Sequence, residues 1–114
     1  MFAAANVTGS ANVAEAAAAS NARLVLVSST AVFGAHRYFP EPTSEEHPLP
    51  ALAPHDHYGR SKQEAERIVL EAHHSGRLWA SVVRPPMMYG RRDRQFIPRL
   101  MPVMRMGLFP VVAG

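Results

Sequence analysis

The chain has 114 residues, of which 47% are apolar and 18% charged, which is typical of one globular domain and not of a disordered segment. It contains no cysteine, which excludes disulfides and thiolate metal sites, and no apolar run approaches the ~18 residues of a membrane span. The net charge of +3 draws on the arginines of "GRRDRQFIPR", but no aromatic platform or recognisable nucleic-acid motif accompanies them. We expect a cytoplasmic protein with no nucleic-acid, membrane or metal partner, in which this basic stretch is solvated or contacts an anionic ligand.

The first expected elements are a helix and a strand. Residues 6–21 are rich in alanine, the best helix former, and place small apolar side chains at helical spacing. The segment "RLVLVSS", residues 23–29, then has four consecutive aliphatic residues without alternation. This pattern predicts a strand that is buried on both faces, as in a parallel sheet.

A long loop and a second helix come next. Residues 35–57 contain five prolines, so this segment cannot be a helix or a central strand. Asp56 is a candidate N-cap for the helix that follows, and Gly76 is a candidate stop signal. Between them, apolar side chains recur at i, i+3, i+4 and i+7, namely Ala65, Ile68, Val69 and Ala72.

The remaining elements are a second strand and a last helix. Residues 79–84, "WASVVR", read as a strand, "PPMMYG" breaks it, and residues 96–106 read as a helix that two prolines shorten or kink. Helices alternating with strands predict an α/β fold with βαβ units and a parallel sheet. Two strands are too few for a sheet of ordinary width, and no glycine spacing forms a G-x-G-x-x-G phosphate loop.

The helix that begins near Asp56 carries a tyrosine and a lysine on one face. Tyr58 and Lys62 are four residues apart, so their side chains lie one above the other. An ammonium near a phenol favours the phenolate, and a phenol tuned in this way can exchange a proton with an alcohol or carbonyl oxygen. Alone this pair is weak, since an exposed amphipathic pair has the same spacing. However, hydroxyl residues end the preceding strand, where ligands bind in open α/β sheets, although such a hydroxyl can also cap its own backbone.

Four motifs, "NVTGSANVAEAA", "VLVSSTAVFG", "YGRSKQEAE" and "VVRPPMMYG", together resemble the extended short-chain dehydrogenase/reductases, the group of NAD-dependent epimerase/dehydratases and 3β-hydroxysteroid dehydrogenases. The resemblance covers nearly the whole chain. It implies a partial Rossmann-type parallel sheet with flanking helices, lacking the N-terminal βαβ units and the C-terminal substrate domain. Residues 1–114 would then be a fragment of a single NAD(P)-binding domain, which by itself is expected to be inactive.

The resemblance also implies roles for individual residues. Tyr58 matches the family's catalytic acid/base, and Lys62 matches the lysine that lowers the tyrosine pKa and holds the nicotinamide ribose. Ser29 matches the hydroxyl that orients the substrate, with Thr30 as the alternative. Pro85 and Pro86 match the loop that closes over the nicotinamide. Asn6 and Glu66 also fall at family positions, the first with an open role and the second as a structural residue.

The cofactor implied is NAD or NADP, with NAD favoured, and the substrate a small molecule with an alcohol or ketone group. The apolar "RPPMMYG" favours a 3β-hydroxysteroid or sterol, and the alternative is a nucleotide-sugar epimerase, dehydratase or reductase. A further alternative is a non-catalytic binding module that keeps half of the fold. For the full-length parent, a homodimer stays open.

Overall fold

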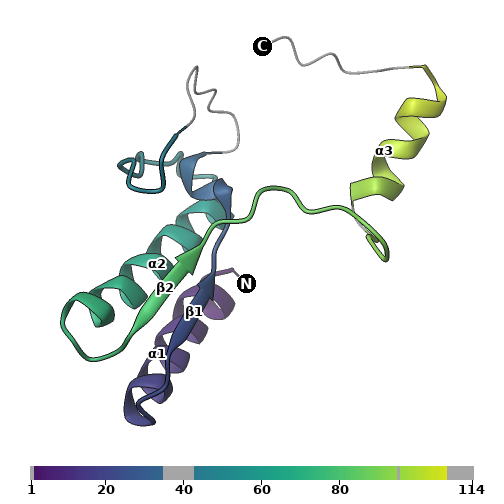
Figure 1. Cartoon of the computed structure of the whole chain (residues 1–114). Coiled ribbons are helices and arrows are strands. Elements are labelled where there is room, and N and C mark those ends of the chain that lie inside the picture. Colours follow the sequence, from purple (N-terminus) through teal and green to yellow (C-terminus); the bar gives the residue numbers. More distant parts are fainter. Residues whose placement is uncertain (1, 35–42, 95, 108–114) are drawn as a thin grey trace.

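The structure is a computed structural model that describes residues 2–34, 43–94 and 96–107 (Figure 1). Its elements follow the order expected from the sequence. They are the π-helical segment η1 (Ala3–Thr8), α1 (Gly9–Ala19), β1 (Leu24–Val27), the 3-10 turn η2 (Thr30–Phe33), α2 (His57–His74), β2 (Ala80–Val83) and α3 (Phe96–Arg105). Part of the predicted proline-rich loop, residues 35–42, lies outside the described residues. The described remainder of that loop, residues 43–56, contains no helix or strand, as its prolines predict.

The two strands form the parallel pair that the helix–strand alternation predicts. β1 pairs with β2 in a register that sets Leu24 opposite Ala80 and Val27 opposite Val83. One further hydrogen bond, from the amide of Ser28 to the carbonyl of Val83 at 2.8 Å, continues the pairing past the strand. The carboxyl ends of both strands are therefore held side by side, and the predicted α/β class is confirmed.

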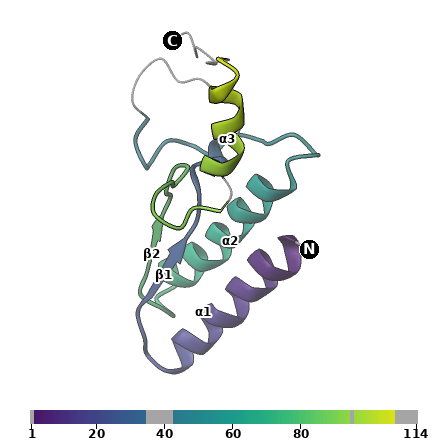
Figure 2. The ribbon, with the colours of Figure 1, turned by 90° about the vertical axis from the view of Figure 1, so that its right-hand side faces the viewer.

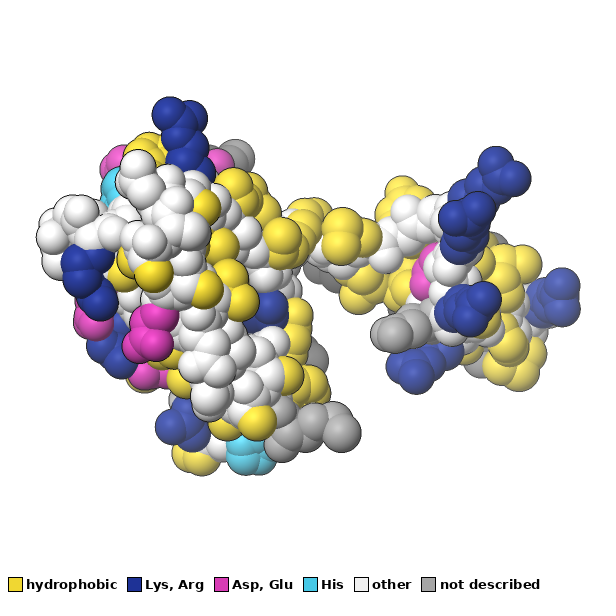
Figure 3. All heavy atoms as spheres, turned by 90° about the horizontal axis from the view of Figure 1, so that it is seen from below, with side chains coloured by type: hydrophobic (Ala, Val, Ile, Leu, Met, Phe, Trp, Pro, Cys, Tyr) yellow, Lys and Arg dark blue, Asp and Glu magenta, His cyan; other side chains and the backbone are white. Residues whose placement is uncertain are grey.

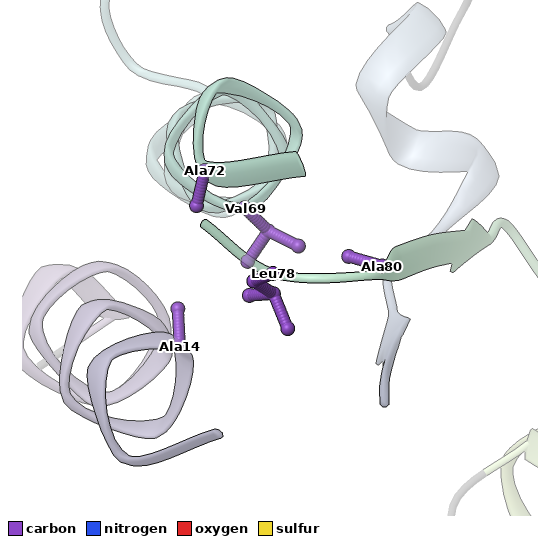
Figure 4. Packing of buried hydrophobic residues seen from close by; sticks show 5 residues of the cluster. All are labelled: Ala14, Val69, Ala72, Leu78 and Ala80. Carbon is purple, nitrogen blue, oxygen red and sulfur yellow. The ribbon is translucent and has the colours of Figure 1, made fainter. Parts of the chain in front are cut away.

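Helices α1 and α2 lie side by side on one face of this sheet (Figure 2). The core between the helices and the sheet consists of Ala14, Val69, Ala72, Leu78 and Ala80, which point toward one another in Figure 4. The alanine side chain is a single methyl group, so the alanine-rich faces of the helices can approach the sheet closely. Ala14, Ala17 and Ala18 lie in or against this core, so these alanines have a packing role beyond their helix propensity.

The prediction that β1 is buried on both faces is wrong for this structure. Leu24 and Leu26 are half-buried against the helices, whereas Val25 and Val27 are each 55% exposed. Side chains alternate along a strand, and both covering helices lie on the same face. An unbroken aliphatic run shows that both faces are apolar, but it does not show that this chain covers both.

The ends of α2 are set by the residues that the sequence suggested. The Asp56 carboxylate accepts a hydrogen bond from the amide of Gly59 at 2.8 Å, which caps the first turn. The helix ends at His74, and Gly76 follows with a φ of 73°, in the left-handed region that favours glycine. These local signals determine where α2 begins and ends, and Tyr58 therefore lies in its first turn.

Helix α3 stands apart from the rest of the described chain (Figure 1), and none of its described residues is buried. The Asp93 carboxylate begins it by accepting hydrogen bonds from the amides of Phe96 and Ile97, and Pro102 lies inside it. Arginine side chains surround this part of the molecule in Figure 3. No helix in the described part of the chain combines the length and apolarity needed to cross a membrane.

Candidate active site

A cleft of about 790 Å³ opens at the carboxyl ends of β1 and β2. It is lined by all of the residues that the sequence analysis put forward for catalysis or nicotinamide binding: Ser29, Thr30, Tyr58, Lys62, Pro85 and Pro86. They come from three different segments, namely the turn after β1, the first turns of α2 and the segment after β2. The carboxyl edge of a parallel sheet is where α/β proteins bind ligands.

Tyr58 and Lys62 occupy successive turns of α2. The Tyr58 side chain is 38% exposed, and its ring packs edge-on against Phe2 with 5.5 Å between ring centroids. The Lys62 ammonium donates to the Val27 carbonyl at 3.0 Å, which anchors it at the end of β1. Because an ammonium has three N–H donors, this contact leaves donors for the hydroxyls of a ligand.

Ser29 both caps a turn and lines the cleft. Its hydroxyl oxygen accepts a hydrogen bond from the amide of Ala31 at 3.2 Å, which begins the 3-10 turn Thr30–Phe33. The sequence left open whether this hydroxyl caps its own backbone or faces a substrate. The structure shows the cap, and it also places Ser29 in the lining of the cleft. The hydroxyl proton is still free to be donated, since the oxygen acts only as an acceptor in the cap.

Ser28, the neighbour of Ser29, has a buried hydroxyl. The residue is 4% exposed and lines the cleft, and its hydroxyl oxygen has no hydrogen-bond partner among the described residues. Leaving a buried polar group unpaired is unfavourable, so such groups are rare and call for an explanation. A polar ligand in the cleft would remove this penalty if it came within reach of the hydroxyl.

Gly59 is a site residue that the sequence analysis missed. A Cβ atom at this position would lie 2.7 Å from the Ala31 carbonyl oxygen and 2.8 Å from the Leu52 Cδ1 atom. Only glycine therefore lets the first turn of α2 rest directly on the turn that follows Ser29. The signal was present in the sequence, because a glycine inside a helix costs about 1 kcal/mol relative to alanine and needs a reason.

The backbone of Tyr58 is held by a chain of two hydrogen bonds. The Asn6 amide donates to the Ser61 hydroxyl at 2.9 Å, and that hydroxyl donates to the Tyr58 carbonyl at 2.8 Å. Asn6 lies in η1, and π-helical turns occur often at functional sites. The role that the sequence left open for Asn6 is thus to connect the first helix to the tyrosine.

A larger hollow of about 1230 Å³ shares no lining residue with the cleft. It runs along α2 beside η1 and residues 51–54, and its charged groups already have partners. Arg67 pairs with Glu64 and Glu71 at 2.6 Å each, and Arg60 donates to the Pro54 carbonyl. The candidate active site is therefore the smaller cleft. In the described part of the chain, no three His, Asp or Glu side chains gather to hold a metal ion.

Comparison with known families gives a match over nearly the whole chain. The family model described as "NAD dependent epimerase/dehydratase family" matches residues 1–113. The chain belongs to this family. Membership of the NAD dependent epimerase/dehydratase family implies use of a nicotinamide dinucleotide and leaves the choice between NAD and NADP open.

Three curated relatives illustrate the range of this family. The N-acetyl-alpha-D-glucosaminyl-diphospho-ditrans,octacis-undecaprenol 4-epimerase of Escherichia coli O157:H7 is 30% identical over 112 residues, which are 96% of this chain and 32% of the epimerase. The 4-hydroxy-2-methyl-3-oxo-4-farnesyl-3,4-dihydroquinoline-1-oxide ketoreductase of Stigmatella aurantiaca is 38% identical over 111 residues, again 96% and 32%. Short-chain dehydrogenase/reductase family 42E member 1 of Danio rerio is 32% identical over 120 residues, 96% and 30%.

The chain therefore spans about a third of the length of these relatives. No solved structure gave a significant match.

The residues present fit one half of the family's cofactor. Lys62 has donors left for ribose hydroxyls, and the buried Ser28 hydroxyl has no hydrogen-bond partner in the part of the chain that the structure describes. Pro85 and Pro86 form a wall of the cleft. The sequence contains no G-x-G-x-x-G turn to hold a pyrophosphate at a helix N-terminus. The chain thus offers candidate partners for the nicotinamide and its ribose, and it contains no such loop for the pyrophosphate.

Proposed function

We propose that the chain forms the central part of a full-length NAD(P)-dependent oxidoreductase that interconverts an alcohol and a ketone, with Ser29, Tyr58 and Lys62 as its catalytic residues. The observation that carries the proposal is the single cleft that gathers these three side chains at the carboxyl ends of two parallel strands. Hereafter, "the full-length enzyme" means this proposed longer protein.

Each of the three side chains has a distinct task in this proposal. Ser29 donates a hydrogen bond from its hydroxyl to the substrate oxygen and so orients the substrate. Tyr58, as phenolate, takes the proton from the alcohol oxygen as the C=O bond forms, and returns it in the reverse reaction. Lys62 stabilises the phenolate by its charge, while the Val27 carbonyl fixes the ammonium. The nicotinamide cofactor, when bound, accepts or supplies the hydride, which no side chain can do.

We further propose an apolar alcohol, such as a sterol or a 3β-hydroxysteroid, as the substrate. Phe33, Pro86, Met87 and Met88 line the cleft, and the two methionines are 65% and 72% exposed. Exposed methionines provide an adaptable apolar surface. The names of two relatives include undecaprenol and farnesyl, both apolar isoprenoid groups. These names support a substrate with a large apolar group.

A nucleotide-sugar epimerase or dehydratase is the second candidate, favoured by the epimerase among the relatives. The two functions differ in the fate of the cofactor. A dehydrogenase releases one reduced cofactor for each substrate oxidised, whereas an epimerase returns the hydride and releases none.

The full-length enzyme should therefore be incubated with panels of sterols and nucleotide sugars in the presence of NAD or NADP. Our proposal predicts that the absorbance of the reduced cofactor increases during incubation with a sterol. Conversion of a nucleotide sugar to its epimer or dehydrated product without reduced cofactor would establish the second candidate instead. The absence of any conversion on either panel would contradict both.

The isolated 114-residue chain should bind dinucleotides weakly, because only the nicotinamide half of the cofactor has partners. Calorimetry with NAD and NADP should give dissociation constants well above the micromolar range. A micromolar value corresponds to about 8 kcal/mol of binding free energy and would contradict this half-site.

A further inference from the structure

The most deeply buried charged side chain of the described residues forms an ion pair at the end of β2. Glu66 on α2 is 1% exposed, and it accepts from the Arg84 guanidinium through contacts of 2.7, 3.0 and 3.2 Å. The Arg84 side chain is 17% exposed. Bidentate arginine–carboxylate contacts are strong and directional, so this pair fixes both the position and the orientation of the Arg84 guanidinium.

The same guanidinium makes two further contacts. It donates to the Glu45 carbonyl at 2.9 Å, which fixes the described segment that leads back to α2. It also lies over the Phe33 ring, 5.2 Å from the centroid, and Phe33 lines the cleft. One planar group thus joins the helix, the loop and a wall of the cleft.

Arg84 is also placed to control a second wall of the cleft. It directly precedes Pro85 and Pro86, and the Pro85 carbonyl accepts from the amide of Thr30 at 3.2 Å. Its partner Glu66 lies one turn beyond Lys62 on α2. The ion pair therefore connects both walls of the cleft to the helix that carries Tyr58.

We propose that Arg84 is a positioning residue that, through Glu66, holds the two walls of the cleft at the distance from Lys62 and Tyr58 that nicotinamide binding requires. The inference rests on the proposed function. A buried ion pair is generally no more stabilising than apolar side chains of similar volume, so stability alone does not explain it. The geometry of the pair explains it better. A lysine could replace the charge of Arg84, but it could not form the bidentate contact with Glu66 or stack on the Phe33 ring.

The test is Arg84→Lys in the full-length enzyme, with Arg67→Lys as the matched control. Arg67 lies on the exposed side of α2 with its side chain 54% exposed, and its partners are also on the surface. Arg84→Lys should raise the KM for the nicotinamide cofactor at least about tenfold, with a smaller change in kcat. The Thr30 amide should exchange its hydrogen at least about tenfold faster as well, because its acceptor is the Pro85 carbonyl. Arg67→Lys should change neither quantity.

A double variant, Glu66→Leu with Arg84→Met, separates positioning from folding. It leaves no unpaired buried charge, so it should melt within a few degrees of wild type and still show the raised KM. The proposal is overturned if either variant keeps the wild-type KM and the wild-type Thr30 exchange, or if both fail to fold. If the enzyme proves to bind no nicotinamide cofactor, the proposed function fails, and the Thr30 exchange rate alone decides whether Arg84 holds the walls.

Discussion

The two halves of helix α2 differ in what their side chains do. The first two turns present Tyr58, 38% exposed, and Lys62, half-buried, to the cleft at the ends of the strands. The second half buries Val69 and Ala72 against α1 and the sheet, at 0% and 4% exposure. Glu66, at 1% exposure, lies at the boundary and carries the ion pair to Arg84.

This contrast shows how one helix can serve chemistry and stability without a conflict between them. A reactive side chain has to reach solvent and ligand, so it contributes little to the core. Core side chains have to be enclosed, so they cannot touch a substrate. Substitutions of the core side chains in the second half should therefore lower the free energy of unfolding and leave the site unchanged. Substitutions of Tyr58 or Lys62 should lower activity and leave the free energy of unfolding nearly unchanged.

The largest loss of stability should follow from Arg84→Met at the boundary. The substitution leaves the Glu66 carboxylate buried without its partner, which typically costs about 3–5 kcal/mol of unfolding free energy. Urea unfolding of the full-length enzyme measures it. A loss below about 1 kcal/mol would mean that the carboxylate finds water or another donor, and that the boundary is less enclosed than the structure indicates.

Val69→Ala should cause the next largest loss, about 2–3 kcal/mol of unfolding free energy, because it removes two methyl groups from a fully buried position and leaves a cavity. The cofactor KM should stay unchanged, because Val69 does not line the cleft. Val13→Ala on α1 is the matched control, and at 54% exposure it should alter stability very little. A raised KM in the folded Val69 variant would show that the two halves are coupled.

Gly59→Ala should invert the ordinary effect of alanine in a helix. Where space allows, alanine stabilises a helix relative to glycine by up to about 1 kcal/mol, but here its Cβ would meet the Ala31 carbonyl oxygen at 2.7 Å. We expect a net loss of stability and a fall in kcat of about tenfold or more, because the Ser29 turn is pushed from Tyr58. Gly9→Ala, whose Cβ would have its nearest neighbour at 3.8 Å, should be neutral or stabilising. Equal behaviour of the two variants would refute the close approach.

The smallest effect on stability should come from Glu64→Gln, on the exposed side of α2. Its hydrogen bond from Arg67 holds the pKa of the Glu64 carboxyl below its ordinary value. A carboxyl whose pKa is lower in the folded state stabilises the protein at neutral pH, and this contribution disappears as the pH falls through the folded pKa. Wild type should therefore exceed Glu64→Gln slightly in stability near neutral pH and not in strong acid. The side chain is 43% exposed, so salt should weaken the difference, and a gap that survives in acid would contradict this origin.

Much of α2 could be predicted because its signals are local. The Asp56 cap, the apolar spacing and Gly76 each act within a few residues. The structure confirms the cap and the stop, and it buries three members of the apolar set, Ala65, Val69 and Ala72, while Ile68 is half-buried. The parallel pairing of the strands also followed from the alternation of elements. The i, i+4 spacing of Tyr58 and Lys62 likewise placed both on one side of the helix.

What the sequence did not reveal depends on contacts between distant segments. The Glu66–Arg84 pair joins residues 18 positions apart, and the contact of Gly59 with Ala31 spans the long loop. Neither follows from periodicity. The burial of β1 on both faces was predicted wrongly for a related reason, since the apolarity of Val25 and Val27 does not show what covers them. Local patterns predicted the candidate site, and only the folded chain shows which contacts support it.

The central claim is that the Tyr58 phenol exchanges the proton, and Tyr58→Phe tests it most directly because it removes only the hydroxyl. Turnover of the full-length enzyme should be measured for wild type, Tyr58→Phe and the control Tyr89→Phe, whose ring is 73% exposed and does not line the cleft. We predict that Tyr58→Phe loses at least about 10²-fold in kcat with cofactor binding largely kept, and that Tyr89→Phe is unaffected. Near-wild-type turnover of Tyr58→Phe would contradict the assignment and reduce the tyrosine–lysine pair to an ordinary feature of the surface of α2.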